Sequence, residues 1–189
     1  MKKAVLFSIK PKPCGEIISE IKGVEVRKRI PKLSVPFTAY IYETKGRKIT
    51  TPAGGVLHEG RGKVIGEFVC KRIDKIGKRG IDNNFDYCYL SLNKFGNDDV
   101  EIEITDIKKS CISKDDLNKY GADVPHLYAL HISDLVIYEE PKDLSEFSCH
   151  DSSYDNSFGG YFEDRDKSVP ITRPPQSWCY VEKLRGVGQ

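Results

Sequence analysis

The sequence predicts an α+β protein in which short strands close into a small β-barrel flanked by short helices. Most apolar runs in the chain are short, and several alternate with polar residues, as half-buried strands do. Two segments instead show helical spacing, with capping residues at their ends. The chain has 189 residues, of which 39% are hydrophobic and 31% charged, so it can bury a sizeable core within one domain.

The first part of the chain contains three predicted strands and one helix. Lys3–Ile9 is a compact apolar run and predicts a buried strand. Pro13–Ile21 has isoleucines at helical spacing, and Gly23 is the residue expected to end this helix. Val24–Lys28 and Phe37–Glu43 alternate between apolar and polar residues, which predicts two further strands.

The middle of the chain contains the strongest strand signal. Lys45–Gly62 is rich in glycine, threonine and charge and predicts a mobile loop. Lys63–Ile76 follows as a long strand in which Gly66 permits a bend or bulge. Two short strands, Tyr87–Leu92 and Val100–Thr105, are expected after it.

A second helix and a long strand follow. Ser113–Tyr120 begins with a serine, has Asp116 three residues on as in a capping box, and is followed by Gly121. Leu127–Glu139 predicts one long strand, or two strands around Ser133 and Asp134.

The end of the chain predicts three parts in the domain organisation. Residues 1–147 form the domain itself, and residues 148–170 form a flexible polar insertion, rich in serine and glycine from Asp151 onward. Residues 171–189 return to strand character at Ser177–Leu184 and are expected to pack back on the barrel.

Composition also restricts the compartment and the cofactors. No apolar run is long enough to cross a bilayer. The apolar run near the first residues is shorter than that of a secretory signal, so we expect a cytoplasmic protein. The six cysteines have no paired spacing, which predicts reduced thiols, no metal site and no cofactor: Cys14, Cys70, Cys88, Cys111, Cys149 and Cys179.

The net charge of +2 hides a strong division along the chain. Residues 1–80 carry 19 Lys and Arg against 7 Asp and Glu, whereas residues 81–189 carry 11 against 21. The basic residues gather in three clusters, at 22–32, 45–48 and 71–79, which could converge on one groove for a polyanion. The alternative is that the two halves interleave in the fold and the basic residues form an ordinary solvated surface.

Several motifs, in this order along the chain, resemble the ASCH domain, a branch of the PUA-like superfamily. They are Ser8–Pro11 (SIKP), KGVEVRKR from Lys22, PFTAYIYETKG from Pro36, GKVIGEFVC from Gly62, SKDDLNKYG from Ser113 and HISDLVIYEEPKDLSEF from His131. ITRPPQSWCYVE from Ile171 resembles the tail of a phage-associated bacterial subset.

The resemblance implies a PUA-like β-barrel with a basic cleft beside the first helix that binds RNA or a nucleotide. The residues of the family motif would be Lys22, Glu25 and Arg27. A carboxylate and a guanidinium on one strand face can contact a base edge and a phosphate together, and a lysine adds a cation for phosphate. We expect Lys10, Arg29 and Tyr42 to form the cleft wall, and binding that weakens on charge reversal at Arg27.

An enzymatic alternative stays open. One ASCH branch resembles an amidohydrolase of acetylated cytidine that uses a lysine, a threonine and a glutamate. Lys22 matches that lysine, but Glu25 replaces the threonine, and no residue could be assigned to the glutamate. Lys22 and Glu25 could also perform acid–base chemistry on RNA. The simplest alternative for the pair is a surface ion pair worth well under about 1 kcal/mol.

The histidines and aromatic residues favour structural interpretations. His131 lies in an apolar strand and is interpreted as a core histidine with a hydrogen-bond partner rather than a catalytic one. His58 and His126 are interpreted as loop residues, and Tyr42 and Trp178 as core or rim aromatics that a cleft could also use. A third function, weaker than the other two, is protein binding through the acidic half.

Overall fold

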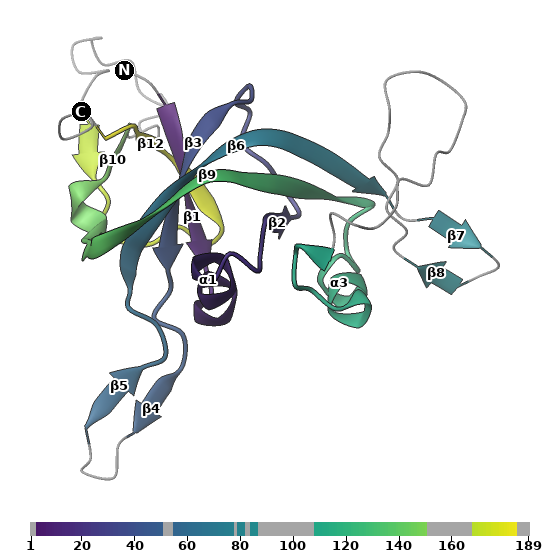
Figure 1. Ribbon diagram of the computed structural model, residues 1–189, viewed down its shortest axis with the longest axis horizontal. Helices are drawn as coiled ribbons and strands as arrows, with labels where there is room; N and C mark the ends of the chain where they lie inside the picture. Colours follow the sequence, from purple (N-terminus) through teal and green to yellow (C-terminus); the bar gives the residue numbers. More distant parts are fainter. Residues whose placement is uncertain are drawn as a thin grey trace, which may run out of the picture. The chain divides into compact units, whose positions relative to one another are not determined.

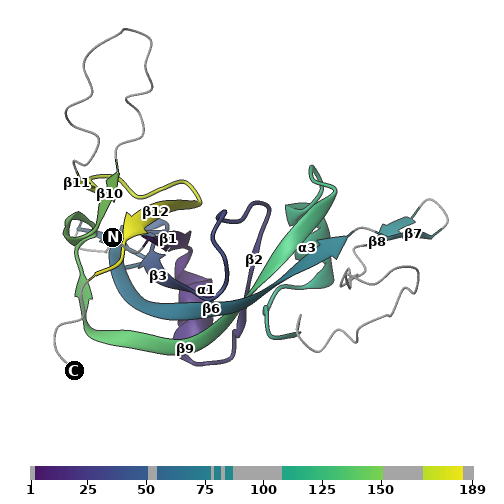
Figure 2. The same cartoon turned by 90° about the horizontal axis from the view of Figure 1, so that it is seen from above.

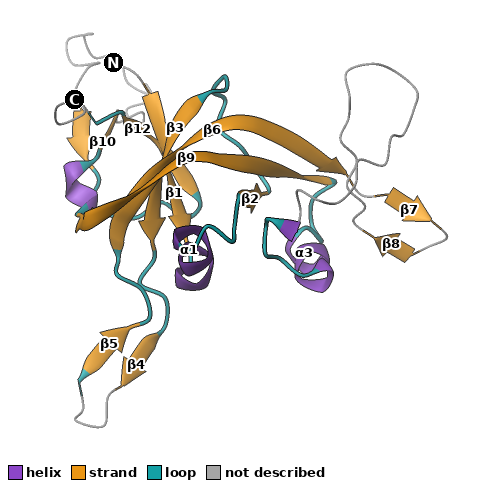
Figure 3. Ribbon diagram, in the orientation of Figure 1, coloured by secondary structure: helices purple, strands orange, loops and turns teal. Residues whose placement is uncertain are grey.

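The computed structural model describes residues 3–50, 55–77, 79–81, 84–86, 108–150 and 168–184. The chain divides into two compact units that draw on different stretches of sequence. Unit 1 comprises Met1–Pro11, Phe37–Phe68 and Val136–Gln189, and unit 2 comprises Lys12–Pro36 and Val69–Leu135. Strands predominate in both, with two short α-helices among the described residues (Figures 1 and 3).

Unit 1 is built around the first strand of the chain. β1 (Lys3–Ile9) pairs parallel with β3 (Phe37–Glu43) and antiparallel with β12 (Trp178–Glu182). β1 is buried from Ala4 to Phe7, and its near-continuous apolar sequence is typical of a strand covered on both faces. The strand predictions for these three segments are therefore confirmed.

Aromatic side chains form much of the core of unit 1. Tyr40 and Phe147 are fully buried and meet edge to face, with ring centroids 4.9 Å apart. The Tyr40 hydroxyl accepts a hydrogen bond from the backbone N–H of Leu184 at 2.9 Å. Phe7 and Phe68 stack with their centroids 6.4 Å apart. These contacts connect β3 with the C-terminal part of the chain, and β1 with Phe68 further along it.

Two long strands run through both units. β6 (Lys63–Gly77) and β9 (His126–Lys142) lie side by side in the sheet and are visible as the longest arrows in Figures 1 and 2. A Cβ atom at Gly66 would overlap the backbone carbonyl oxygen of Val136, so a glycine is required where β6 and β9 approach each other. β9 is continuous, and a left-handed residue within it, Asp134 (φ 47°), marks the position at which two strands were the alternative.

Unit 2 contains β2 (Val24–Arg27), which pairs antiparallel with β9, and the helix α3 (Lys114–Tyr120). The buried residues of its core are Val24, Val26, Ile76, Leu117, Leu127 and Ala129. The Ser113 hydroxyl accepts a hydrogen bond from the N–H of Asp116 at 3.1 Å, and Gly121 follows the helix, so both predicted caps of α3 are confirmed.

The first helix begins and ends earlier than the sequence predicts. α1 spans Pro11–Ile18, because a proline fits the first helical turn, where its missing N–H is not needed. The residue that ends it is Glu20, in the left-handed region with φ 58°, and not Gly23. The N–H of Ile21 bonds to the carbonyl of Glu16, and the N–H of Glu20 to that of Ile17, which together form a Schellman motif.

The predicted mobile loop Lys45–Gly62 is instead a β-hairpin. β4 (Lys48–Thr50) pairs antiparallel with β5 (Val56–His58), so His58 lies in a strand and not in a loop. Strand alternation could not reveal this hairpin, because both of its faces are exposed and neither needs to be apolar.

Five further short elements complete the described part. β7 (Arg79–Ile81) pairs with β8 (Asn84–Asp86), and β10 (Ser148–His150) pairs with β11 (Ser168–Pro170), with the 3-10 helix η1 (Leu144–Glu146) before β10. The predicted strands Tyr87–Leu92 and Val100–Thr105, and most of the predicted insertion, lie outside the described residues.

The main sheet has six strands in the order β12-β1-β3-β6-β9-β2. The pairing among the described residues leaves β12 and β2 as its two ends and does not close into a ring, so the barrel stays a prediction. Both units combine residues from the basic and the acidic half of the sequence, so the charge division does not correspond to the division of the fold. Within the described ranges, the helices are too short or too polar to cross a membrane.

Candidate functional site

The residues of the predicted motif come from β2 and the turn before it. Lys22 lies between α1 and β2, and Glu25 and Arg27 lie on β2. The backbone N–H groups of Gly23 and Val24 both donate to the carbonyl of Lys109, at 2.8 and 3.1 Å. The segment around Lys109 therefore holds the start of β2, while β9 pairs along its length.

The structure brings Lys22, Glu25 and Arg27 together in one ion-pair cluster. The Lys22 ammonium nitrogen is 3.4 Å from Glu25 Oε2 and donates a hydrogen bond to the carbonyl of Ser110 at 2.5 Å. Arg27 Nε is 2.9 Å from Glu25 Oε1. One carboxylate thus faces two cations, which gives these three side chains a net charge of +1.

Burial distinguishes this cluster from an ordinary surface ion pair. Lys22, Glu25 and Arg27 are only 2%, 7% and 8% exposed. Charged side chains are rarely buried to this extent unless they are paired, because their desolvation costs far more free energy than that of neutral groups. The interpretation of the pair as a weak surface contact is therefore wrong, and the cluster is costly to disrupt.

Two residues to which the sequence assigned no part in the site extend the cluster along the sheet. Arg27 is paired with Tyr128 in the β2–β9 register, and residues directly opposite each other share a face of the sheet. The Tyr128 hydroxyl lies 2.9 Å from His126 Nε2, and the two rings meet edge to face. His126 is the first residue of β9, not a loop residue. The alternation His126, Tyr128, Leu130 was the available signal.

The other predicted site residues are placed differently. Arg29 is exposed just beyond β2 in unit 2. Lys10 is exposed at the end of β1, and Tyr42 is 4% exposed within the core of unit 1, where burial raises the pKa of its hydroxyl. The structure therefore joins three of the six predicted residues directly and assigns Lys10 and Tyr42 to the other unit.

Three cations of the basic clusters are paired with carboxylates. Lys28 pairs with Asp123, Lys71 with Asp134, and Arg72 with Asp74, at nitrogen–oxygen distances of 2.5, 2.8 and 2.6 Å. All three carboxylates belong to unit 2, as do the basic clusters at 22–32 and 71–79, whereas the cluster at 45–48 belongs to unit 1. The described residues do not show the three clusters converging on one groove.

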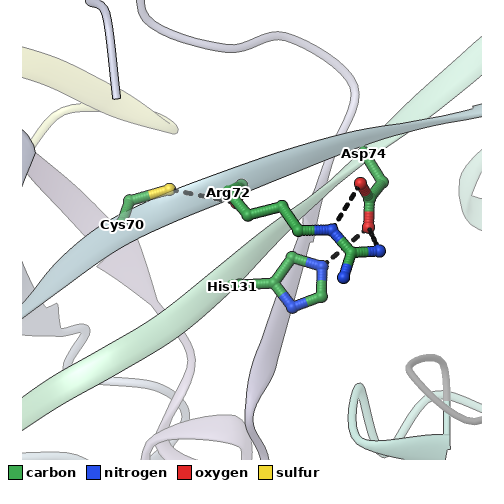
Figure 4. A network of polar contacts seen from close by, with 4 residues as sticks. All are labelled: Cys70, Arg72, Asp74 and His131. Carbon is green, nitrogen blue, oxygen red and sulfur yellow. Dashed lines mark hydrogen bonds and ion pairs between the residues drawn. The ribbon is translucent and has the colours of Figure 1, made fainter. Parts of the chain in front are cut away.

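A second polar network lies in unit 2 around Asp74, and Figure 4 shows its side chains pointing toward one another. Arg72 reaches both carboxylate oxygens of Asp74, at 2.8 and 2.6 Å, and His131 Nε2 lies 2.7 Å from Oδ2. Cys70 donates a weak hydrogen bond to the Arg72 carbonyl, and burial raises the pKa of its thiol to about 11. His131 therefore has a carboxylate partner, as the structural interpretation expected.

We expect Asp74→Asn to destabilise the protein more at pH 6 than at pH 2. Burial of the Asp74 carboxyl favours its neutral form, but hydrogen bonds from Arg72 and His131 and the positive charge of both outweigh it and lower its pKa. Ionised Asp74 therefore stabilises the fold above the unfolded-state pKa of about 3.9, and this contribution disappears as the pH falls through the folded-state pKa. Urea unfolding of both proteins across this range measures the difference.

The control for this prediction is Glu140→Gln, at an exposed position on β9. Its effect on the free energy of unfolding should change little with pH compared with that of Asp74→Asn. A difference between wild type and Asp74→Asn that stayed constant from pH 6 to pH 2 would contradict the role given to the Asp74 charge.

Crystal structures of ASCH proteins share the fold of this chain. ASCH from Zymomonas mobilis is 16% identical, with 95% of this chain and 88% of that chain covered and a TM-score of 0.55. A tyrosine-to-phenylalanine mutant of ZmASCH is 17% identical, with 96% of this chain and 92% of that chain covered and a TM-score of 0.55. A serine-to-alanine mutant is 16% identical, with 95% of this chain and 89% of that chain covered and a TM-score of 0.54. The fold is ASCH-like.

This likeness extends to the fold and not to the details of the site. No protein-family model matches the sequence, and no curated protein matches it significantly. Membership of a phage-associated subset and a cytoplasmic location stay predictions. Among the described residues of this ASCH-like fold, no three histidine, cysteine or carboxylate side chains gather as metal ligands would.

Proposed function

We propose that this ASCH-like protein binds RNA or a nucleotide at the face of unit 2 formed by β2 and β9. The observation that carries the proposal is the buried Lys22–Glu25–Arg27 cluster, which stands next to the partly buried Tyr128 on the same face. The cluster holds a net positive charge in a poorly solvated position, where its interaction with a phosphate is only weakly screened.

Each part of this face has a role in the proposal. Tyr128 supplies a ring on which a base can stack, and Glu25 supplies a carboxylate that can accept from an exocyclic amine. Arg29, exposed next to the cluster in sequence, is the cation that meets the ligand phosphate first. Lys22 and Arg27 set the local potential from below the surface.

We expect saturable, salt-sensitive binding of a short single-stranded RNA in fluorescence-anisotropy titrations at two salt concentrations. Arg29→Glu and Tyr128→Ala should each weaken binding about ten-fold, the first by removing a phosphate contact and the second by removing base stacking. Arg29 is exposed and Tyr128 is only partly buried, so neither substitution disrupts the core. These variants are therefore better probes of binding than charge reversal at the buried Arg27.

The matched control is Lys119→Glu, an exposed charge reversal on α3 in the same unit. It changes the net charge as Arg29→Glu does, but it lies outside the proposed face and should leave the dissociation constant close to that of wild type. Equal losses in Arg29→Glu and Lys119→Glu would mean that only the overall charge matters. An absence of RNA and nucleotide binding at low salt would reject the proposal.

A hydrolase of RNA or of acylated nucleosides is a second candidate. The observation in its favour is that the Lys22 ammonium lies 3.4 Å from a Glu25 carboxylate oxygen, so that an acidic and a basic group stand in one cluster. Prolonged incubation with RNA and with acetylated cytidine, followed by chromatography, tests it. Intact substrates would eliminate this candidate and leave the binding function unaffected.

A further inference from the structure

The hairpin of β4 and β5 lies in unit 1 and has no part in the proposed function. We call residues 44–50 and 55–62 the arm. Figures 1 and 3 show it as a ribbon that extends away from the ends of β3 and β6. Its two strands pair Lys48 with His58, Ile49 with Leu57, and Thr50 with Val56.

Hydrogen bonds and an ion pair join the two sides of the arm at its base. Glu43 is 6% exposed, accepts a hydrogen bond from the N–H of Arg61 at 3.0 Å, and lies 3.5 Å from the Arg61 guanidinium. The Gly60 N–H donates to the Lys45 carbonyl at 3.0 Å, and a Cβ at Gly60 would overlap the carbonyl oxygen of Thr44. These contacts join the two strands of the arm at its base, and the pairing of β4 with β5 continues from there.

An uncovered aliphatic pair lies on one face of the arm. Ile49 and Leu57 are directly opposite each other and are 52% and 59% exposed. Both faces of the ribbon are open, and an isolated two-stranded hairpin gains little stability in water. Ile49 and Leu57 therefore add almost nothing to the stability of the fold in this state, and their apolar surface is available to a partner.

The charge of the arm indicates the kind of partner. Residues 44–62 carry four basic side chains and one acidic one: Lys45, Arg47, Lys48 and Arg61 against Glu59. The side chain of Arg47 is 89% exposed, and its nearest approach to Glu59 is 3.7 Å, which leaves its charge largely in solvent. A surface with aliphatic side chains at its centre and cations around them fits a polyanion that also presents apolar groups.

We propose that the arm docks in the major groove of duplex DNA. A ribbon with side chains on both faces is about 10 Å thick, which matches the roughly 12 Å width of the B-form major groove but not the narrower minor groove. In this position Ile49 and Leu57 meet thymine methyl groups, and Arg47 and Glu59 lie on the same face toward the base edges. Lys45 and Lys48 contact phosphates, whereas Arg61 stays paired with Glu43 at the base of the arm.

This inference does not depend on the proposed function, because it uses another unit and another ligand. The groove of A-form RNA that corresponds to the major groove is too deep and narrow for a ribbon. The arm should therefore prefer duplex DNA to duplex RNA of the same sequence, whereas the β2–β9 face is proposed to take RNA or a nucleotide.

The test is an anisotropy titration of the full chain with a labelled DNA duplex of about 20 base pairs, two turns of B-form helix, over several salt concentrations. The double variant Ile49→Ala/Leu57→Ala should weaken duplex binding about ten-fold with an unchanged salt slope, because it removes apolar surface and no charge. Lys45→Ala/Lys48→Ala should reduce the salt slope by about two, since each substitution removes one cation that neutralises a phosphate. All four positions are exposed, so the fold should be retained in both variants.

The control variant is Ile21→Ala/Val136→Ala, which removes two aliphatic side chains that are 65% and 50% exposed outside the arm. It should bind duplex DNA as wild type does. Equal affinity for duplex RNA or single-stranded DNA, full binding by Ile49→Ala/Leu57→Ala, or no duplex binding at low salt would each overturn the proposal. Arg29→Glu separates the two proposals, since it should reduce RNA binding and leave DNA binding unchanged.

Discussion

Glu25→Ala should lower the free energy of unfolding by about 3–5 kcal/mol, as expected when one partner of a buried ion pair is removed. Glu25 faces both the Lys22 ammonium and Arg27 Nε, and all three side chains are buried. Without the carboxylate, two buried cations would face each other with no counter-charge. Urea unfolding followed by circular dichroism measures the loss.

The comparison for this prediction is Lys71→Ala, which breaks an ion pair whose two side chains are 54% and 56% exposed. Solvent screening limits its effect to about 1 kcal/mol or less. If Glu25→Ala cost no more than Lys71→Ala, the cluster would be accessible to water in solution, and the burial on which the proposed function depends would be incorrect.

Tyr40→Ala should cost about 3–5 kcal/mol, as large-to-small substitutions at buried aromatic positions do. The ring is fully buried, contacts Phe147 edge to face, and leaves a cavity in unit 1 when it is removed. Tyr40→Phe keeps the ring and removes only the acceptor for the Leu184 N–H, so it should cost about 1 kcal/mol. Thermal or urea unfolding of both variants separates packing from hydrogen bonding.

Tyr120→Ala is the matched control, because this tyrosine is 38% exposed on α3 and its ring centroid is 5.1 Å from the Lys28 ammonium. Removing the ring there should cost about 1 kcal/mol or less. If Tyr40→Ala and Tyr120→Ala lowered the free energy of unfolding equally, the Tyr40 ring would not be packed in the core of unit 1.

Local sequence patterns predicted the elements whose signals are complete within a few residues. α3 begins at the serine cap and ends before the glycine that the sequence indicates, and β6 covers the predicted strand almost residue for residue. The first helix was misplaced because Glu20, which ends it, is not a residue type that marks a left-handed position. Its conformation is set by the Schellman hydrogen bonds, which composition does not reveal.

The candidate site was predicted in part. The positions of Lys22, Glu25 and Arg27 followed from the resemblance to the ASCH domain, and their mutual contact follows from their places on and beside one short strand. Tyr128 and His126 were missed, because only the β2–β9 register places them opposite that strand. The interpretation of Lys22 and Glu25 as a surface pair failed for the same reason, since burial depends on chain segments distant in sequence.

The sequence by itself determined the six strands of the main sheet, the caps of α3, and the residue types of the candidate site. Only the tertiary structure decided that the basic and acidic halves mix in both units, that Lys22, Glu25 and Arg27 are buried together, and that β4 pairs with β5. Alternation and capping are patterns within a few neighbouring residues, whereas burial and strand pairing depend on contacts between residues far apart in sequence.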